Sequence, residues 1–306
     1  MQQQWVIETK ALTRRFGQQT AVNQVSLHVE PGRIYGLLGR NGAGKTCLMK
    51  MLLGLMAPTS GEIWLFGEKV TAPKREILCR IGSLIEAPGF YPNLTGTENL
   101  EILARIRGTI SHQAVQRALD LVELPYQDKK RYRQYSLGMK QRLGIAGTLL
   151  NDPELLILDE PTNGLDPIGI YAIRQLLRGL SADFGKAVLI SSHQLAEMEQ
   201  LVDDIGILQQ GVLLEESDYQ ALVKRNGQCI YLKVGQLEKA ALVLEHMGIH
   251  QYVVEEDAIC IWEMTHESAA INRALVKAGV DVSVIMPRQD TLEDYFKQIT
   301  GGVGIA

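Results

Sequence analysis

The residues with the clearest capacity for chemistry lie in one glycine-rich stretch near the N-terminus. Gly39, Gly44, Lys45 and Thr46 follow the spacing Gly-x-x-x-x-Gly-Lys-Thr, after a short apolar run and before a helical pattern. In such a turn, backbone N–H groups and the helix N-terminus surround phosphate oxygens. Lys45 is expected to reach the β- and γ-phosphates, and the Thr46 hydroxyl to bind Mg²⁺. The predicted nucleotide site comprises Gly39, Asn41, Gly42, Ala43, Gly44, Lys45, Thr46 and Cys47.

Cys47 has a second possible significance. It follows Thr46 directly, near the expected start of a helix, where a thiol becomes more reactive. A maleimide would then inactivate the protein, and nucleotide would protect it. The alternative interpretation is a buried, inert thiol on the helix.

Two carboxylates follow an unbroken apolar run. Leu155–Leu158 is typical of a parallel strand buried on both faces, and it ends at Asp159 and Glu160. Asp159 is predicted to hold Mg²⁺. Glu160 is predicted to act as the general base or to orient the attacking water. An ordinary acidic turn after a buried strand is the alternative.

A histidine ends another apolar run. Ala187–Ile190 is followed by Ser191-Ser192-His193, which would allow His193 to contact the γ-phosphate. A lone histidine in this position is more often structural. The phosphate-binding stretch and the paired carboxylates together favour a catalytic role for His193.

One further segment connects these motifs. Tyr135–Arg142 reads YSLGMKQR, which resembles the signature Leu-Ser-Gly-Gly-Gln of the ABC ATPases. Ser136 and Gly138 match this signature, whereas Tyr135, Leu137 and Met139 depart from it. A serine that caps a helix would explain Ser136 equally well. The order of the motifs, with Asn163-Gly164-Leu165-Asp166 after the carboxylates, resembles the ABC ATPases over about residues 4–215.

The resemblance implies a shared nucleotide site. Two such domains would meet head to tail as a homodimer, and each ATP would be held between one phosphate-binding loop and the signature of the second ATPase subunit. Ser136 and Gly138 would then serve the ATP of the other subunit, and Asp166 would also belong to the nucleotide site. Phe16 would stack on the adenine. Separate transmembrane permease subunits would supply the transport path.

The elements that must position these residues indicate two domains. Alternating strands near the N-terminus, apolar runs before each motif and a helical segment at about residues 88–150 favour an α/β P-loop NTPase with a RecA-like core, an antiparallel β subdomain and a helical subdomain. This ATPase domain is expected to span residues 1–217. Residues 218–306 follow the order β-α-β-β-α-β, which predicts a small ferredoxin-like α+β accessory domain.

One departure narrows the resemblance. Glu86, in Ile81–Pro88, stands where the family normally has a glutamine that senses Mg²⁺ and the membrane subunit. Together with Phe90-Tyr91 and Glu98-Asn99-Leu100, it resembles the lantibiotic-immunity and bacitracin-resistance ATPases, which export peptide antibiotics. Glu86 is therefore assigned to the catalytic and metal-binding residues. A carboxylate has no N–H donor but binds a hard cation with a full charge, so Glu86→Gln is expected to keep ATP binding and to change coupling to transport.

Several other classes of nucleotide-binding protein carry motifs that can be compared with this chain. Within the family, the alternative is the ATPase subunit of another ABC-2 type drug, lipid or polysaccharide exporter. A soluble chromosome or ribosome ABC protein would carry a coiled-coil insertion or two ATPase modules, and this chain has neither. A GTP-binding switch would carry Asn-Lys-x-Asp, which is absent. A non-enzymatic nucleotide sensor would be expected to lack Glu160.

Composition indicates where the protein acts. The 306 residues carry a net charge of -4, which gives no bulk attraction to nucleic acid. Four cysteines without metal-like spacing are typical of reduced thiols. No stretch approaches the roughly 18–20 apolar residues of a membrane helix, and the N-terminus shows no signal pattern. We therefore expect a cytoplasmic protein that binds no nucleic acid and lies on the inner face of the cell membrane through its permease subunits.

Overall fold

The chain folds into two compact units, one that ends at Tyr219 and one that begins at Gln220. The computed structural model describes residues 5–71, 74–86, 89–108, 111–226, 228–254, 257–262, 267–289 and 291–300. Both units contain a sheet with a hydrophobic core of its own. Every helix within these ranges is too short or too polar to cross a bilayer.

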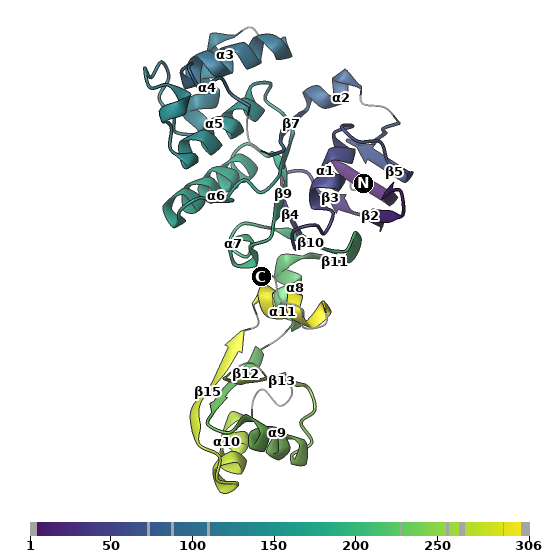
Figure 1. The fold of residues 1–306 in the computed structure, drawn as a ribbon, viewed down its shortest axis with the longest axis vertical. Coiled ribbons are helices and arrows are strands. Elements are labelled where there is room, and N and C mark those ends of the chain that lie inside the picture. The colour runs from purple at the N-terminus through teal and green to yellow at the C-terminus, as the bar shows by residue number, and fades with distance from the viewer. Residues whose placement is uncertain are drawn as a thin grey trace. The chain divides into compact units, whose positions relative to one another are not determined.

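A six-stranded sheet forms the centre of the first unit. Its strands follow the order β11 (Val212–Asp218), β10 (Asp204–Gln209), β4 (Ile34–Leu38), β9 (Ala187–Ser192), β8 (Leu155–Leu158) and β7 (Ile81–Leu84). All neighbours are parallel except β11, which pairs with β10 in the antiparallel sense. Every residue of β4, β8 and β9 is buried, which explains their unbroken apolar runs. Helix α1 (Lys45–Leu52) lies on one face of this sheet and α6 (Pro167–Ala182) on the other (Figure 1).

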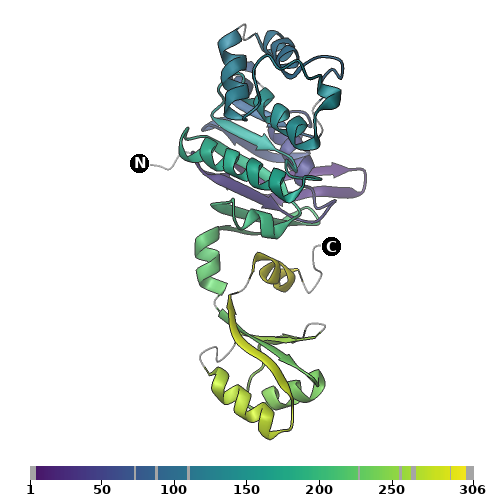
Figure 2. The same ribbon diagram turned by 90° about the vertical axis from the view of Figure 1, so that its left-hand side faces the viewer.

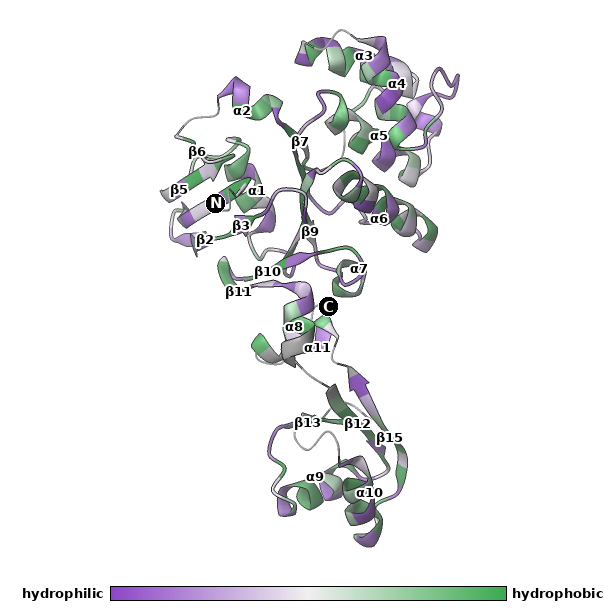
Figure 3. Cartoon of the chain, turned by 180° about the vertical axis from the view of Figure 1, so that it is seen from behind, coloured by the Kyte–Doolittle hydropathy of each residue, from purple (hydrophilic) through white to green (hydrophobic). Residues whose placement is uncertain are grey.

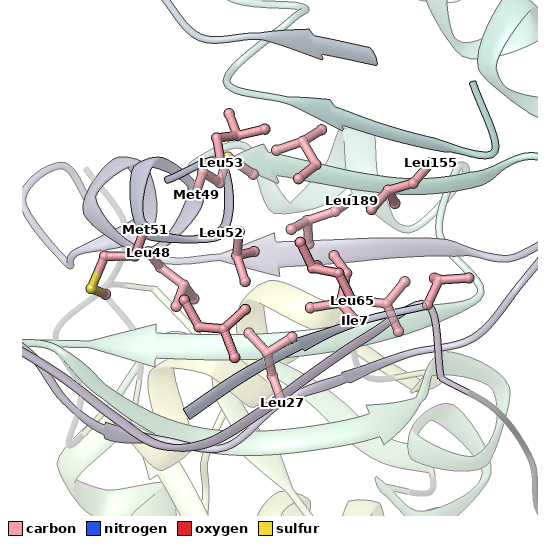
Figure 4. Packing of buried hydrophobic residues seen from close by; sticks show 14 of the residues in the cluster. Ile7, Leu27, Leu48, Met49, Met51, Leu52, Leu53, Leu65, Leu155 and Leu189 are labelled. Atoms are coloured by element: carbon pink, nitrogen blue, oxygen red, sulfur yellow. The ribbon is translucent and has the colours of Figure 1, made fainter. Parts of the chain in front are cut away.

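An antiparallel sheet covers α1 from the outside. It contains β2 (Gln19–Val25), β1 (Ile7–Phe16), β5 (Ser60–Leu65) and β6 (Glu68–Lys69), with β3 (His28–Val29) paired to β1. Its inward side chains, those of α1 and those of the central sheet form one hydrophobic core. Figure 4 shows this packing, in which side chains of α1 lie among those of both sheets, including Ile7, Leu27, Leu65, Leu155 and Leu189.

A helical segment occupies the chain between β7 and β8. It contains α3 (Gly96–Arg107), α4 (His112–Leu121), the 3-10 turn η1 (Tyr132–Gln134) and α5 (Leu137–Leu149) (Figure 2). A further short helix, α2 (Arg75–Cys79), lies outside this segment and precedes β7. Thr95 and Glu98 begin α3 with a capping box, and Gly108 ends it in a left-handed conformation. Helix α3 therefore begins and ends where its own residues satisfy the terminal backbone groups.

The second unit contains a four-stranded antiparallel sheet. After α8 (Tyr219–Asn226), its elements are β12 (Gln228–Val234), α9 (Leu237–His246), β13 (Tyr252–Val254), β14 (Ile259–Ile261), α10 (Ser268–Lys277), β15 (Val282–Gln289) and α11 (Leu292–Ile299). The strand order β13-β14-β12-β15 is the ferredoxin-like arrangement predicted from the sequence. Helices α9 and α10, which mix apolar and polar residues (Figure 3), contribute their buried side chains to the core of this sheet.

Candidate active site

The phosphate-binding loop joins β4 to α1. Gly44 lies at the N-cap of α1 with a φ of 107°, in the left-handed region that favours glycine. A Cβ on Gly44 would also lie 2.4 Å from the backbone oxygen of Ala21 in β2. The loop is thus packed so closely against β2 that only glycine fits, and the start of α1 is left facing the cleft beside it.

Lys45 is buried at the first position of α1. Its side chain is 5% exposed, and its Nζ donates to the backbone oxygen of Gly39 at 2.6 Å. The same Nζ lies 3.2 Å from Oε1 of Glu160. The structure therefore brings together the lysine of the phosphate-binding loop and the proposed general base, which are far apart in the sequence.

Asp159, which directly follows β8, accepts hydrogen bonds from two hydroxyl groups. Oγ1 of Thr46 donates to Oδ2 of Asp159 at 2.8 Å, and Oγ of Ser191 donates to Oδ1 at 2.6 Å. Asp159 itself is only 9% exposed. A carboxylate and a hydroxyl are the hard oxygen donors that Mg²⁺ prefers, so Thr46 and Asp159 fit the metal that the sequence assigns to them.

Glu160 lies between a lysine and a histidine. Nδ1 of His193 is 2.8 Å from Oε2 of Glu160, and because a carboxylate only accepts, this nitrogen carries the hydrogen. Oε1 is buried and accepts no hydrogen bond from the described residues, although Lys45 is its ion-pair partner. The backbone of Glu160 has a φ of 48°, a left-handed conformation unusual for this residue type. Such strain is found most often at functional sites.

Ser191 organises both carboxylates, and sequence reasoning assigned it no role. Its Oγ donates to Asp159 and accepts from the backbone N–H of Glu160 at 2.8 Å, and the residue is fully buried. The neighbouring strands β8 and β9 are in parallel register, with Leu158 opposite Ile190. The signal that could have identified Ser191 is its position directly after the apolar run of β9, as Asp159 directly follows β8.

Lys45, Thr46 and Glu160 border an open cleft of about 550 Å³, whereas Gly39, Asp159, Ser191 and His193 lie outside its lining. Phe16 lies at its edge with 43% of its surface exposed, and the guanidinium of Arg14 lies 4.5 Å from the centre of the Phe16 ring. The cation therefore occupies one face of the ring. Half-buried Cys47 also lines the cleft. The full lining is Phe16, Gln19, Thr20, Ala21, Arg40, Asn41, Gly42, Ala43, Gly44, Lys45, Thr46, Cys47, Glu160 and Gln210.

The signature residues and Asp166 do not line this cleft. Ser136 caps α5 by accepting from the backbone N–H of Met139 at 3.3 Å, and Asp166 caps α6 by accepting from that of Gly169 at 2.8 Å. Both helix starts are exposed. The capping role considered for Ser136 is present, and its assignment to the nucleotide of a second subunit stays a prediction.

Tyr135, which departs from the family signature, has a local explanation. Its side chain is 5% exposed, and a Cβ on Gly96 at the start of α3 would lie 2.6 Å from the Tyr135 hydroxyl. The Tyr135 ring lies 6.0 Å from that of Tyr132, which in turn contacts Phe90 at 5.4 Å. The larger side chain thus fills a space that the absent side chain of Gly96 leaves open.

Glu86 lies two residues beyond β7, outside the lining of the cleft. Its Oε1 forms an ion pair with Nζ of Lys50 on α1 at 2.8 Å, and its side chain is 70% exposed. The hydrogen bond with Lys50 lowers the pKa of Glu86 below its ordinary value. The metal-binding and catalytic roles assigned to Glu86 stay predictions.

Comparisons with known proteins agree with this geometry. A model of the ABC transporter family matches residues 22–163. The bacitracin transport ATP-binding protein BcrA of Bacillus licheniformis is 48% identical over 97% of this chain and 98% of its own length. The lantibiotic transport ATP-binding protein SrtF of Streptococcus pyogenes is 42% identical over 70% of this chain and 91% of its own length.

A solved structure shows the same architecture. An ATP-binding cassette determined as a dimer in a post-hydrolysis state, with ADP and phosphate bound, superimposes with a TM-score of 0.62 at 26% identity and covers 70% of this chain and 98% of its own. The predicted fold class and the family resemblance are thereby confirmed. The chain belongs to the ATP-binding subunits of the ABC transporters and is an ATPase.

Proposed function

We propose that this chain hydrolyses ATP to ADP and phosphate in the cleft and thereby powers the export of peptide antibiotics of the bacitracin or lantibiotic type. The observation that supports the hydrolytic part is the buried Oε1 of Glu160, which is ion-paired with Lys45 but accepts no hydrogen bond from the described residues. The substrate class is supported by the similarity to BcrA, which extends over nearly the whole length of both chains.

The residues of the loop and of β8 would divide the work of binding. Lys45 would exchange its contacts with Gly39 and Glu160 for the terminal phosphates of ATP. Thr46 and Asp159 would hold Mg²⁺, which neutralises charge that develops on the phosphates. Ser191 keeps Asp159 oriented for this purpose through its 2.6 Å bond.

Glu160 and His193 would serve the chemical step. Glu160 would accept a hydrogen bond from the attacking water and orient it, a role worth roughly 10²- to 10⁴-fold in rate. His193 donates from Nδ1 to the other carboxylate oxygen and so holds the group in place. Its remaining ring nitrogen would be available to the γ-phosphate.

Assembly would complete the site. We propose a head-to-tail homodimer, in which Ser136, Gly138 and Asp166 of one subunit contribute to the nucleotide site of the other. A related cassette has been solved as a dimer, which supports the pairing. Permease subunits would hold the dimer on the inner face of the cell membrane, in the cytoplasm.

Within each subunit, residues 1–217 would form the ATPase domain and residues 218–306 the accessory domain. Glu86 would assist catalysis and metal binding.

The test is drug protection in cells that express the chain together with its permease. Lys45→Ala and Glu160→Gln should each reduce ATP turnover of the purified complex by at least about 10²-fold and abolish protection against bacitracin or a lantibiotic. Lys69→Ala, which removes an exposed lysine of β6 outside the cleft, is the matched control and should behave like the parent. Parental turnover in either active-site variant would refute the hydrolytic assignment. Full hydrolysis without protection against any peptide would refute only the substrate class.

A further inference from the structure

An ion pair between Lys50 and Glu86 joins α1 to the segment that follows β7. Thr46 and Lys50 are four residues apart on α1, so they share one face of the helix, about 6 Å apart along its axis. Glu86 follows β7, which pairs with β8 so that Leu84 lies opposite Leu158. The backbone N–H of Asp159 donates to the backbone oxygen of Leu84 at 2.8 Å. Lys50 therefore reaches from the helix of Thr46 to the loop next to Asp159.

Two of the three carboxylates in this region are paired with a lysine, and Asp159 is not. Lys45 pairs with Glu160 at 3.2 Å and Lys50 pairs with Glu86 at 2.8 Å. In the part of the chain that the structure describes, no lysine or arginine lies within ion-pair distance of Asp159, whose side chain accepts hydrogen bonds from the hydroxyls of Thr46 and Ser191. Each of the other two carboxylates is thus balanced by an ammonium, and Asp159 is left for an external cation.

Lys50 is close enough to Asp159 for their charges to interact. The pKa of Lys50 is raised, chiefly by the hydrogen bond with Glu86 and more weakly by the charge of Asp159. A glutamine in place of Glu86 could not neutralise this ammonium, because it carries no charge. The lysine and the glutamate are therefore matched to each other.

We infer that Lys50, one helical turn from Thr46 on α1, is a positioning residue, which holds the Glu86 carboxylate and is itself neutralised by it. The inference rests on the proposed function of this cleft. The pair is exposed and hence weak, so Glu86 can leave Lys50 without a large cost when the site is occupied. Glu86 itself has a left-handed backbone with a φ of 64°, which is uncommon for this residue type.

The first test measures the pair without nucleotide or metal. Amide hydrogen exchange of the segment around Ser83–Glu86 is compared in the parent, in Lys50→Met, in Glu86→Gln and in the double variant. Each single variant should exchange a few-fold faster, and the double variant no faster than the singles, because one contact is lost in all three. Parental exchange in Lys50→Met, or a double variant that multiplies the two single effects, would overturn the inference.

The second test measures the charge balance at the metal site. Mn²⁺ is titrated into the full chain with ADP, and free Mn²⁺ is followed by its electron paramagnetic resonance signal. Lys50→Met removes a positive charge near Asp159 and should tighten Mn²⁺ binding by about three- to tenfold. Glu86→Gln removes a negative charge and should weaken binding by a similar factor. Lys50→Arg should restore the parental affinity.

Lys69→Met is the control for the metal titration. It breaks an ion pair between Lys69 and Glu62, which are both exposed, and it should leave Mn²⁺ affinity unchanged. Unchanged affinity in Lys50→Met, or an equal change in Lys69→Met, would contradict the inference. Neither readout requires ATP turnover, so a parent that bound Mn²⁺ and ADP but failed to hydrolyse ATP would refute the proposed function and leave the positioning role standing.

Discussion

Replacement of Ser191 by alanine removes the one hydroxyl that bonds to both Asp159 and Glu160, the two carboxylates that we propose for the site. The residue is fully buried, and the substitution removes a single oxygen atom with almost no change in packing. Two hydrogen bonds are lost, one to the charged Asp159 at 2.6 Å and one from the N–H of Glu160 at 2.8 Å. The first is worth about 1.5–3 kcal/mol and the second about 1 kcal/mol. We therefore expect a loss of roughly 2.5–4 kcal/mol in the free energy of unfolding.

The assay is scanning calorimetry of the full chain together with ATP turnover. For a unit of this size, 1 kcal/mol corresponds to about 2–4 °C, so Ser191→Ala should lower the melting temperature by roughly 5–15 °C. Turnover should fall by up to about 10²-fold, because both carboxylates lose their orientation.

The neighbouring Ser192 offers a matched control. It is 1% exposed, and its hydroxyl bonds only to neutral backbone groups of Gln194: it accepts from the N–H at 2.9 Å and donates to the carbonyl oxygen at 3.5 Å, a long and weak bond. Ser192→Ala should therefore cost about 1 kcal/mol. If Ser191→Ala melted within about 2 °C of Ser192→Ala and kept parental turnover, the assignment of Ser191 to the two carboxylates would be wrong.

Three further predictions concern other parts of the first unit. Gly96→Ala should destabilise the protein by about 1–3 kcal/mol in urea unfolding, because the new Cβ would meet the Tyr135 hydroxyl, and adding Tyr135→Phe should recover part of this loss; no recovery would contradict the explanation. The N–H of Thr95 donates to Glu98 at 2.7 Å and lowers its pKa from the usual 4.5, so the stability from this bond is present above that value and lost as pH falls through the lowered pKa. Glu98→Gln should flatten the acid side of the stability profile, and an unchanged profile would count against the cap. Maleimide labelling of Cys47, which lines the cleft, should slow when MgATP is bound. Equal labelling rates with and without nucleotide would refute the prediction that bound nucleotide covers this thiol.

Motifs made of neighbouring residues could be predicted from the sequence. The spacing from Gly39 to Thr46 specifies a loop and a helix start within eight residues, so no distant contact is needed to identify it. Asp159 and Glu160 were identifiable for a similar reason, because they directly follow the apolar run of β8. The same local rules predicted the succession of strands and helices in the second unit, which the structure confirms.

Contacts between distant residues could not be predicted in this way. The partners Lys50 and Glu86 come together from α1 and from the segment after β7, and Ser191 meets Asp159 because β9 is paired with β8. Neither the order of strands in a sheet nor the direction of a side chain across it is contained in local spacing. The sequence by itself thus determined which groups are candidates for the chemistry. Only the tertiary structure decided which partner balances and orients each of them, because hydrogen bonds and ion pairs depend on separations of about 3 Å that only the packed fold sets.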